Sequence, residues 1–559
     1  SENGLSYAPG QKVQIFVGPE TKFMSGRDSY LDFDFKIKLP AGKKPTKLQL
    51  DENGASLLIR NIRIFDGTRG NLLEEINSYD SYVSVKYDYD TNDSLRNLRA
   101  LREGATSAVF DTRGTEGTSI TSVANTVSNP YFKRVNTDST TIWSDDDFLT
   151  AKCCVPINSG IFAGNDSVFP LMMTQGLYIE IDLNDASRVL KQLDSVSQFR
   201  RLPLNPHFHS INGSTAPDDW GLDTPEDTFY VSAKNNLRGA EALERFPFCV
   251  GETFKFCTPV NNTVGPTMSG EMEISEINLS ATALGGEQLI QVVINAARSP
   301  EVADIVTESQ VMYSTSVSSE SSYDASYEVS NVNLVVAQVQ LDPAYEKGML
   351  QKVREGRAIE FDIHTATNYK HSILASDRQT TFQIFAQNSR AKSLCIVPQD
   401  STVYNSAQAI SASGTYSITN NIQDRYMNAN RSAYTGISDR LSSIQFQLNG
   451  KLVPSRPVTT KKIATKNSID AFHLYELEKT LDNAHIEPKS FSKFQENFVF
   501  GRGFSAAGQN GALDLRGKDL GVILKYEETA APDKGKLFNS FVFHVRRLVI
   551  RDGGVEVQL

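Results

Sequence analysis

The sequence predicts a mainly β protein built from two tandem antiparallel sandwiches, with a few short helices and long loop insertions. Apolar residues alternate with polar ones in segments spread over the whole chain, which is the period of a half-exposed strand. Turn-forming pairs such as Asn449-Gly450 follow several of these segments. The chain has 559 residues, whereas one sandwich takes roughly 200–250, so two sandwiches with insertions fit its length.

The clearest strand lies near the N-terminus. Leu31, Phe33, Phe35, Ile37 and Leu39 alternate with charged residues, which places every apolar side chain on one face. The same alternation, with the apolar residues pointing inward, recurs at 177–183, 335–341, 444–448, 522–526 and 541–545. Near the C-terminus the turn at 552–554 separates two short apolar segments and predicts a hairpin. This pattern favours antiparallel sandwiches over a parallel βαβ core.

Four segments have helical spacing. The first spans 71–87, with Leu72, Ile76, Tyr79 and Val83 on one face. The second spans 342–354, where Asp342 can cap the N-terminus, Pro343 suits the first position and Gly356 ends the helix. The third lies at 187–196. The fourth begins near Ser468 and directs Phe472, Tyr475 and Leu481 inward.

A weak internal repeat accompanies the first two helices. A strand at 57–65 leads into the helix at 71, and a strand at 331–341 leads into the helix at 342, which suggests two related halves. Long polar stretches rich in Ser, Thr, Asn and Gly separate the strands at 103–144, 205–227 and 307–330. Such long loops are uncommon in a compact domain unless they are functional or make contacts with other chains.

Composition excludes several classes of protein. The net charge is −10, from 56 basic and 66 acidic residues, so no basic face for nucleic acid is expected. The densest basic cluster, Lys461, Lys462 and Lys466, is interpreted as a solvated loop. No apolar run is long enough for a membrane-spanning helix, and the N-terminus lacks the pattern of a signal peptide. Five cysteines do not form a disulfide framework, which favours a reducing compartment.

The search for metal ligands finds no complete set. His207 and His209 could share a strand face, but no third ligand follows at a suitable spacing. The pairs Cys153-Cys154 and Cys249/Cys257 are interpreted as small buried hydrophobic residues. A calcium loop starting at Asp88, Asp90 and Asn92 fails, because Asp93 stands where glycine is required and Arg99 where glutamate is required.

The nucleotide-binding motifs also fail. Gly501, Gly503 and Ala506 match a dinucleotide fingerprint, but turn-like residues follow where a helix is needed. Gly517-Lys518 is followed by Asp519 rather than Ser or Thr, so no phosphate loop is expected. We therefore predict no catalytic, cofactor-binding or metal-ligating residues, no cofactor, and a protein that is not an enzyme.

The order of several phrases resembles a known family. Three phrases carry most of this resemblance: TFQIFAQNSRAKSLCIVPQ at 381–399, IQFQLNGKLVPSRP at 444–457, and 498–505 followed by 520–526 and 541–545. Further support comes from 30–39, from 58–65 with Leu72-Leu73-Glu74-Glu75-Ile76, and from 169–171. Together they resemble the double jelly-roll major capsid proteins of virophages, Polinton-type elements and large eukaryotic DNA viruses, with virophage proteins closest.

The resemblance implies an architecture and a role. It implies a first jelly roll at 1–342 with a long insertion around 185–330, and a second jelly roll at 343–559. It further implies a structural protein that trimerises into pseudo-hexameric capsomers and tiles an icosahedral shell. The expected partners are copies of itself, neighbouring trimers, penton and minor capsid proteins and a viral maturation protease, without sequence-specific nucleic-acid binding. The expected location is the virion, after assembly in the host cytoplasm or a viral factory.

Two other classes of function remain open. A secreted or surface adhesin or lectin-type binding protein would also be rich in strands and polar loops. A glycan-cleaving enzyme on sandwiches would need two carboxylates about 5–10 Å apart and aromatic side chains for stacking. The chain has only two tryptophans, Trp143 and Trp220, which disfavours the enzyme.

Overall fold

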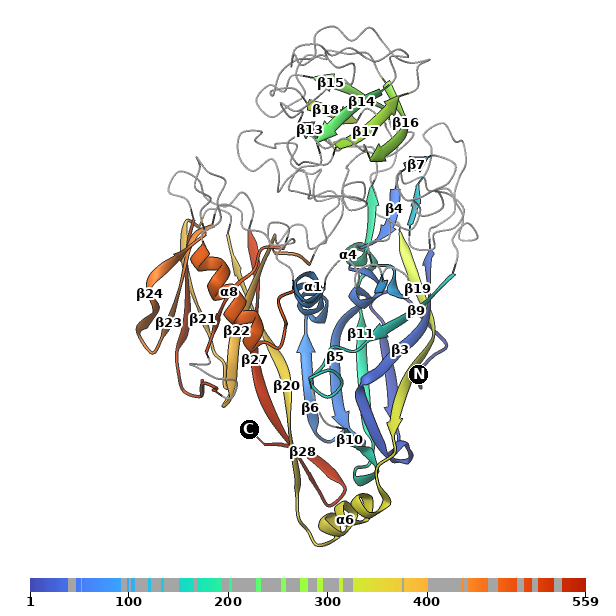
Figure 1. Cartoon of the computed structure of the whole chain (residues 1–559), viewed down its shortest axis with the longest axis vertical. Coiled ribbons are helices and arrows are strands. Elements are labelled where there is room, and N and C mark those ends of the chain that lie inside the picture. Colours follow the sequence, from blue (N-terminus) through green and yellow to red (C-terminus); the bar gives the residue numbers. More distant parts are fainter. Residues whose placement is uncertain are drawn as a thin grey trace.

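In the computed structural model the chain forms an elongated body of upright strands (Figure 1). The structure describes residues 1–38, 47–51, 53–91, 98–99, 102–105, 119–121, 132–134, 150–164, 168–193, 201–203, 228–232, 253–257, 272–279, 289–294, 311–314, 325–374, 377–400, 434–436, 441–460, 471–489, 497–504, 511–526 and 535–558. Two sandwiches stand side by side, and a smaller sheet lies beyond one end of the first sandwich (Figure 1).

The first sandwich consists of two antiparallel sheets. One sheet has the order β1-β19-β3-β9, from β1 (Ser6–Tyr7), β19 (Ser326–Val339), β3 (Phe23–Lys38) and β9 (Thr150–Pro156), and β10 (Phe169–Pro170) also pairs with β3. The other has the order β2-β11-β5-β6, from β2 (Lys12–Val17), β11 (Leu177–Leu183), β5 (Ile59–Asp66) and β6 (Leu72–Asn77).

The second sandwich repeats this arrangement. One sheet has the order β20-β27-β22-β25, from β20 (Ile359–Ile373), β27 (Lys536–Arg551), β22 (Ala391–Asp400) and β25 (Phe500–Gly503), and β28 (Gly554–Gln558) pairs with β27. The other has the order β21-β26-β23-β24, from β21 (Gln379–Ile384), β26 (Leu520–Tyr526), β23 (Leu441–Leu448) and β24 (Lys451–Thr459).

The two strand orders are the same when the main strands of each sandwich are numbered along the chain. In both, the first, eighth, third and sixth strands form one sheet, and the second, seventh, fourth and fifth form the other. This order defines a jelly roll. The expected fold class, a mainly β double jelly roll, is therefore confirmed.

Helices connect the strands at three important places. The helix α1 (Tyr79–Asp90) lies between the fifth and sixth strands of the first roll, and α8 (Ala471–Asn483) lies at the same place in the second. The helix α6 (Pro343–Arg354) joins the two rolls at the end of the molecule opposite the small sheet (Figure 1). The shorter helices are α4 (Ala186–Val189), η1 (Pro19–Thr21), η2 (Gly54–Leu58) and η5 (Leu171–Met173).

Between the seventh and eighth strands of the first roll the chain makes an additional antiparallel sheet. Its strands are β13 (Arg201–Pro203), β14 (Thr228–Ser232), β15 (Thr253–Cys257), β16 (Met272–Leu279), β17 (Leu289–Ile294) and β18 (Val311–Ser314), and β7 (Ser119–Thr121) pairs with β16. A three-stranded sheet of β4 (Lys47–Leu50), β8 (Phe132–Arg134) and β12 (Leu190–Leu193) lies between this sheet and the first roll (Figure 1).

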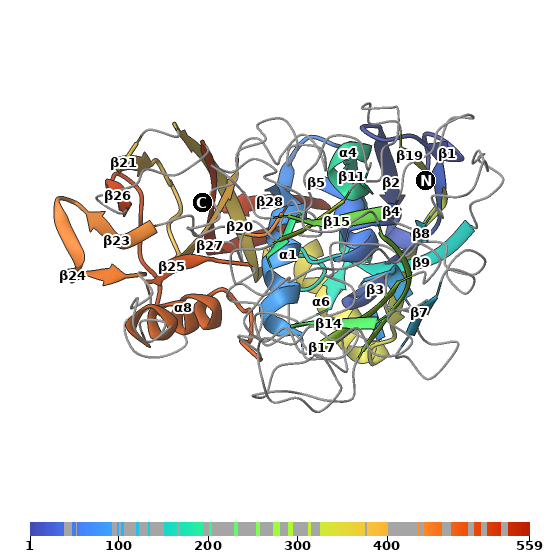
Figure 2. The same ribbon diagram turned by 90° about the horizontal axis from the view of Figure 1, so that it is seen from above.

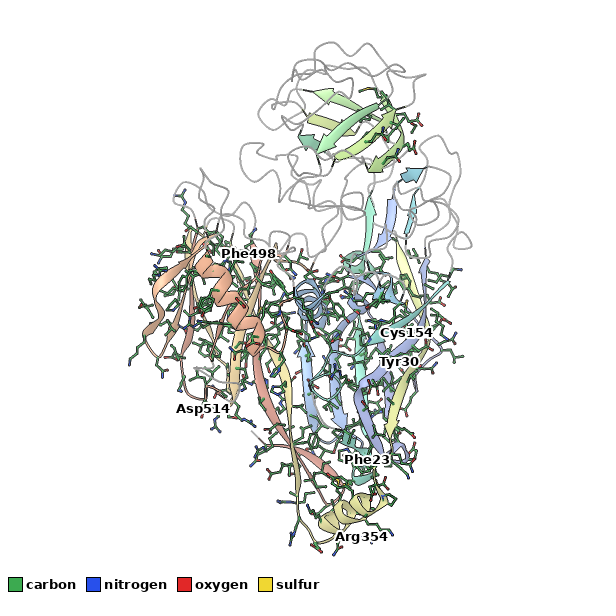
Figure 3. The ribbon with its side chains drawn as sticks, viewed as in Figure 1. Phe23, Tyr30, Cys154, Arg354, Phe498 and Asp514 are labelled. Carbon is green, nitrogen blue, oxygen red and sulfur yellow. The ribbon has the colours of Figure 1, made fainter. Side chains whose placement is uncertain are left out.

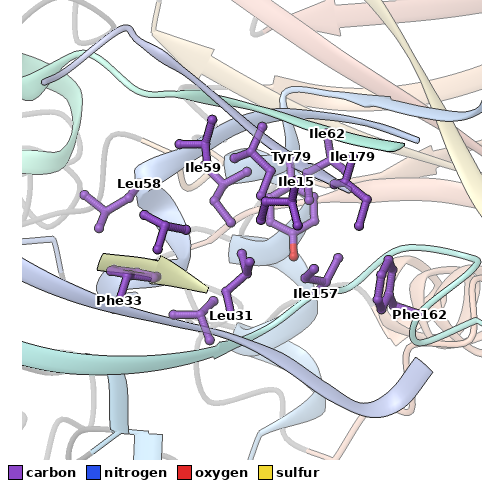
Figure 4. Close-up of a cluster of buried hydrophobic side chains, with 14 of the residues drawn as sticks. Ile15, Leu31, Phe33, Leu58, Ile59, Ile62, Tyr79, Ile157, Phe162 and Ile179 are labelled. Atoms are coloured by element: carbon purple, nitrogen blue, oxygen red, sulfur yellow. The ribbon is translucent and has the colours of Figure 1, made fainter. Parts of the chain in front are cut away.

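The alternation of the N-terminal strand is confirmed. In β3, Leu31, Phe33, Phe35 and Ile37 are buried, whereas the charged residues between them are partly exposed. These side chains meet Ile15, Ile62 and Ile179 of the opposite sheet in the core shown in Figure 4. Leu39 lies outside the described residues.

The predicted inward face of 335–341 is wrong at Val335, which is 38% exposed. The pairing of β19 with β3 shifts register between Ser330 and Asn333 and again between Val335 and Ala337. Each irregularity reverses which side chains point inward, so Leu334 and Val336 pack on the core instead.

The first predicted helix is half wrong. Residues Leu72–Asn77 form strand β6, and the helix begins only at Tyr79. The apolar residues of this short segment fit both the spacing of a helix and the alternation of a strand. The segment forms a strand because it pairs with β5. Similarly, the helix predicted at 187–196 covers only Ala186–Val189, because the chain continues as β12.

The other two helices occur nearly as predicted. At the start of α6 the Asp342 carboxylate accepts a hydrogen bond from the Ala344 amide, and Gly356 ends the segment with a φ of 73°. In α8 the inward assignment of Tyr475 is wrong, because this side chain is 55% exposed. Leu481 is buried, as predicted, and forms a stripe with His473 and Leu477 at a spacing of four residues, whereas Phe472 is partly buried.

The internal repeat is real, but the predicted pairing of helices is wrong. The helix of the first roll, α1, corresponds by its place in the strand order to α8 and not to α6. The helix α6 is the connection between the rolls. The order of all strands and helices identifies this repeat better than one strand followed by one helix does, because that pair of elements occurs in many folds.

In the part of the chain that the structure describes, no helix is long and apolar enough to cross a membrane.

Replacing Phe35 with alanine is expected to destabilise the chain by about 3–5 kcal/mol, because the ring is fully buried and its removal leaves a cavity. Urea unfolding followed by circular dichroism measures this free energy. The matched control is Phe385→Ala, since Phe385 is 74% exposed, and its loss should change stability by no more than about 0.5 kcal/mol. Equal effects of the two variants would contradict the assigned core.

Candidate functional site

The candidate site is the junction where the two rolls meet, because polar and apolar side chains of both rolls are in contact there. Strand β6 of the first roll faces β20 and β28 of the second, and α1 lies between the rolls (Figures 1 and 2). Tyr79 and Val83 of this helix belong to the first core, whereas Val85 and Tyr89 belong to the second. A helix buried by both rolls joins their cores into one body.

Aromatic rings and hydrogen bonds fix the helix against the second roll. The ring of Tyr82 lies 6.1 Å from that of Phe541 and 5.9 Å from that of Phe543, both on β27. The Tyr89 hydroxyl donates to the Asn497 carbonyl at 2.7 Å, and the Asn497 amide nitrogen donates to Asp88 at 2.6 Å. These directional contacts set the orientation of the helix, and the rings supply most of the buried apolar area.

The buried carboxyl group of Glu74 ties β6 to both rolls. It accepts hydrogen bonds from the amides of Gly160 and Ile161 at 2.6 and 3.2 Å, and from the Thr365 hydroxyl of β20. At the neighbouring residue of β6, the Leu73 carbonyl accepts a hydrogen bond from a guanidinium nitrogen of Arg546 on β27 at 2.7 Å. Burial lowers the pKa of Arg546, and the nearby carboxylates of Glu74 and Glu75 oppose that shift. These hydrogen bonds offset the cost of burying the Glu74 carboxyl group, whereas a buried carboxyl group without donors would destabilise the fold.

Two glycines let the backbones of the rolls approach closely. The His364 amide of β20 donates to the Gly164 carbonyl at 3.0 Å. A Cβ atom at Gly164 would lie 2.3 Å from the His364 carbonyl oxygen, and one at Gly160 would lie 2.8 Å from it. A larger residue at either position therefore requires the two rolls to move apart.

Three histidines from distant parts of the chain line one small cavity at this junction. The cavity has a volume of about 40 Å³, and its lining includes His364, His485, His544 and Lys392. The rings of His364 and His485 have centroids 3.7 Å apart, and His544 Nε2 lies 2.9 Å from the Thr367 hydroxyl. This space suffices for a few water molecules, whereas small-molecule sites usually span about 300–1,000 Å³.

One of these histidines, His544, is uncharged at neutral pH. Burial, assisted by the neighbouring Arg546, lowers the pKa of His544 from 6.5 to about 3. Burial also lowers the pKa of the Lys392 ammonium, with Arg390 acting in the same direction. The neutral His544 imidazole therefore contributes packing and a hydrogen bond to the junction, because desolvation disfavours its charged form.

The described sequence candidates for metal or nucleotide binding have other structural roles. Asp88 and Asp90 lie on α1, with Asp90 3.1 Å from both Lys86 and Lys489, so the segment is a helix and not a calcium loop. Gly501 lies in β25, where a Cβ atom would meet the Leu394 carbonyl oxygen at 2.3 Å, and this close strand packing accounts for the glycine. Gly517 is a turn residue with a φ of 64°. The positions outside the described residues are Asn92, Asp93, His207, His209, Cys249, Ala506 and the lysines 461, 462 and 466.

Three of the described cysteines, Cys153, Cys154 and Cys395, differ in exposure. Cys153 is buried, as predicted, and Cys395 is buried as well, whereas Cys154 points to the outer face of β9 and lies 3.7 Å from Asp32. The prediction that this residue is buried is therefore wrong, since neighbours on a strand point to opposite faces. Burial raises the pKa of the Cys395 thiol to about 12, and partial burial together with Asp32 raises the pKa of Cys154. Neither thiol has the low pKa of a reactive cysteine.

Within the described ranges, no group of three or more His, Cys, Asp or Glu side chains could hold a metal ion. The junction is interpreted as a structural feature that fixes one roll against the other, because α1 belongs to both cores and hydrogen bonds join the two rolls. Sequence reasoning missed it, because Glu74, Gly164, His364 and His544 come from four separate segments. The only local signal is the unusual density of tyrosines at 79–89.

The strand order and the junction define the class: the chain is a double jelly-roll protein whose rolls form one body. No model of a protein family matches the sequence. No curated protein matches it either.

Solved structures show a likeness along nearly the whole chain. PBCV-1 VP54, fitted into a cryo-EM reconstruction of the virophage Sputnik, is 12% identical with a TM-score of 0.44, covering 99% of this chain and 93% of VP54. The Faustovirus major capsid protein is 8% identical with a TM-score of 0.45, covering 98% and 89%. The mavirus major capsid protein is 10% identical with a TM-score of 0.34, covering 100% and 92%.

Replacing Gly164 with alanine is expected to destabilise the chain by about 1–3 kcal/mol, because the new methyl group clashes with the His364 carbonyl. Urea unfolding measures the change. The control is Gly348→Ala in α6, where a Cβ atom meets nothing within 4 Å, and the better helix propensity of alanine should leave stability equal or slightly higher. A neutral Gly164→Ala variant would show that the rolls do not approach as described.

Acid is expected to weaken the fold through His544. Its pKa is about 3 in the folded chain and 6.5 in the unfolded chain, so the unfolded chain binds the proton first as the pH falls. Full stabilisation is present above pH 6.5 and is lost as the pH decreases toward 3, at up to about 1.4 kcal/mol per pH unit. Between pH 7 and pH 5 the chain should lose about 2 kcal/mol more than the His544→Gln variant, measured by urea unfolding at both pH values. Parallel losses in the two proteins would contradict the burial of a neutral imidazole.

Proposed function

We propose that the chain is the major capsid protein of an icosahedral virus, and that three copies form a capsomer of pseudo-hexameric outline. The observation that carries this proposal is the duplicated jelly roll, with both copies held rigidly side by side by one shared junction. The sequence resemblance to the double jelly-roll capsid lineage points in the same direction.

The geometry suits a wall-forming subunit. Strands of both rolls run along the length of the molecule, so two similar columns stand next to each other (Figure 1). Three such chains around a threefold axis present six similar columns. The resulting hexagonal outline allows trimers to pack closely on a surface. A head-to-tail contact that closes after three copies provides this arrangement.

The surface charge suits a subunit that is stored before assembly. A net charge of −10 keeps free chains apart in solution and disfavours direct binding of the genome. In this proposal the protein is a structural component of the virion and not an enzyme. It is assembled in the host cytoplasm or a viral factory.

We assign residues 1–342 to the first domain, with the insertion around 185–330, and residues 343–559 to the second. Sheet membership supports a division in the α6 region, because no sheet pairs a strand of β1–β19 with a strand of β20–β28 in the described chain. The proposed partners are further copies of the chain, penton and minor capsid proteins and a viral maturation protease.

The purified chain is expected to be a trimer at micromolar concentration. Light scattering coupled to gel filtration should give three times the mass of one chain, and negative-stain images should show particles with a hexagonal outline. A monomer that binds glycans on an array would instead support the adhesin or lectin-type alternative and reject the capsid proposal.

A further inference from the structure

The cavity at the junction of the rolls has a basic lining. Lys86, Lys392 and the three histidines form part of its wall, and none of the described residues that line it is Asp or Glu. The other lining residues are apolar, glycine or neutral polar residues such as Ser159 and Asn483. Because a buried positive charge is costly without a negative counterpart, such a lining favours an anion as the occupant.

Two carboxylates lie close to the lining, and both already interact with neighbouring groups. Glu74 accepts hydrogen bonds from the Gly160 amide at 2.6 Å and from the Thr365 hydroxyl, and both donors belong to residues that line the cavity. Asp90 lies 3.1 Å from the Lys86 ammonium. An anion in the cavity would therefore use the other polar groups of the wall.

The local backbone places Lys392 at the cavity. Its neighbours Ala391 and Ser393 pair with two successive residues of β27, so Lys392 is an extra residue in β22. A β-bulge of this kind redirects a side chain and is common next to functional sites. Lys392 is accordingly only 7% exposed, although lysine side chains usually reach solvent. Burial and Arg390 both lower the pKa of its ammonium group, and a nearby anion would oppose this shift.

Two histidines from different elements meet at the same cavity. His364 lies on β20, and His485 follows α8 with a φ of 55°, which is a left-handed turn at the end of the helix. Their ring centroids are 3.7 Å apart. His485 and Ala163 are exposed, whereas Lys392 is buried, so the cavity reaches solvent on one side and a small ion can enter it.

The size of the cavity limits the occupant. Its volume of about 40 Å³ compares with about 30 Å³ for one water molecule in the liquid, so a monatomic ion fits and a nucleotide or sugar does not. Both rolls contribute to the wall, with Ser159 and Gly160 from the first and Lys392 and His485 from the second. An ion held there contacts both rolls and opposes their separation.

We propose that the junction cavity binds a small inorganic anion of the size of chloride, held by the Lys392 ammonium and by the imidazoles of His364 and His485. A neutral imidazole donates one N–H and a protonated one donates two, so both histidines can serve as donors. The anion supplies a negative charge that the lining lacks and stabilises the contact between the rolls. This inference concerns the folded chain and does not depend on the proposed trimer.

The first test measures how chloride affects the stability of the intact chain. At neutral pH and constant ionic strength, sodium chloride replaces sodium gluconate, whose anion is too large for the cavity. Chloride at ten times its dissociation constant should raise the equilibrium constant for folding about 11-fold in the wild type, measured by urea unfolding. Lys392→Met should lose this dependence, because it removes the ammonium group and keeps an unbranched side chain.

Two further variants make this test specific. Arg354→Gln removes an exposed positive charge from α6, at the end of the molecule away from the junction (Figure 3), and should keep the response of the wild type to chloride. His364→Phe retains a ring against His485 but removes both ring nitrogens, so it should weaken the response. It replaces Lys392→Met as the test variant if that chain does not fold.

The second test locates the ion directly. Crystals of the intact chain soaked in sodium bromide should show an anomalous difference peak inside the cavity, beside Lys392, because bromide is a close substitute for chloride. A response to chloride that is equal in the wild type and Lys392→Met, with no bromide peak in the cavity, would overturn the site and leave water as its occupant. A response that Arg354→Gln also loses would indicate general screening of charge and would likewise overturn it.

Discussion

The burial of α1 between two sandwiches is the constraint on which the rest of the structure depends. Its tyrosines and valines complete both cores, so neither sandwich has a finished surface on that side without the other. Glycines at 160 and 164 permit the backbone of one sandwich to lie against that of the other. The apolar contacts supply the attraction, and the bonds of Glu74, Asp88 and Tyr89 select a single orientation.

This arrangement explains why polar residues are abundant at an interior surface. An apolar junction would tolerate sliding, because hydrophobic contacts have little directionality. The Glu74 carboxyl group has donors from both sandwiches, and Arg546 bonds to the Leu73 carbonyl. Displacing one sandwich leaves these buried groups without partners, and each such group costs about 1–3 kcal/mol. Relative rotation of the two sandwiches is therefore strongly opposed.

Sequence patterns predicted the architecture better than the contacts between its parts. Alternation along 31–37 and 177–183 identified strands, since one face of each is buried and the other is not. The pattern misled at Val335, where two register shifts reverse the faces, and at 72–77, where a short apolar segment suits both a helix and a strand. The junction could not be predicted from the sequence, because residues such as Glu74, His364 and His544 are far apart in the chain and meet only after both sandwiches form.

The site of the long insertion has a consequence for how such a chain can diversify. The insertion leaves the first sandwich from β11 and returns through β19, and each of these strands is paired on both sides within its own sheet. The two anchor points are therefore among the most firmly held in the molecule. An insertion of different length or composition between them would change the surface at one end of the molecule while the two sandwiches keep their shape.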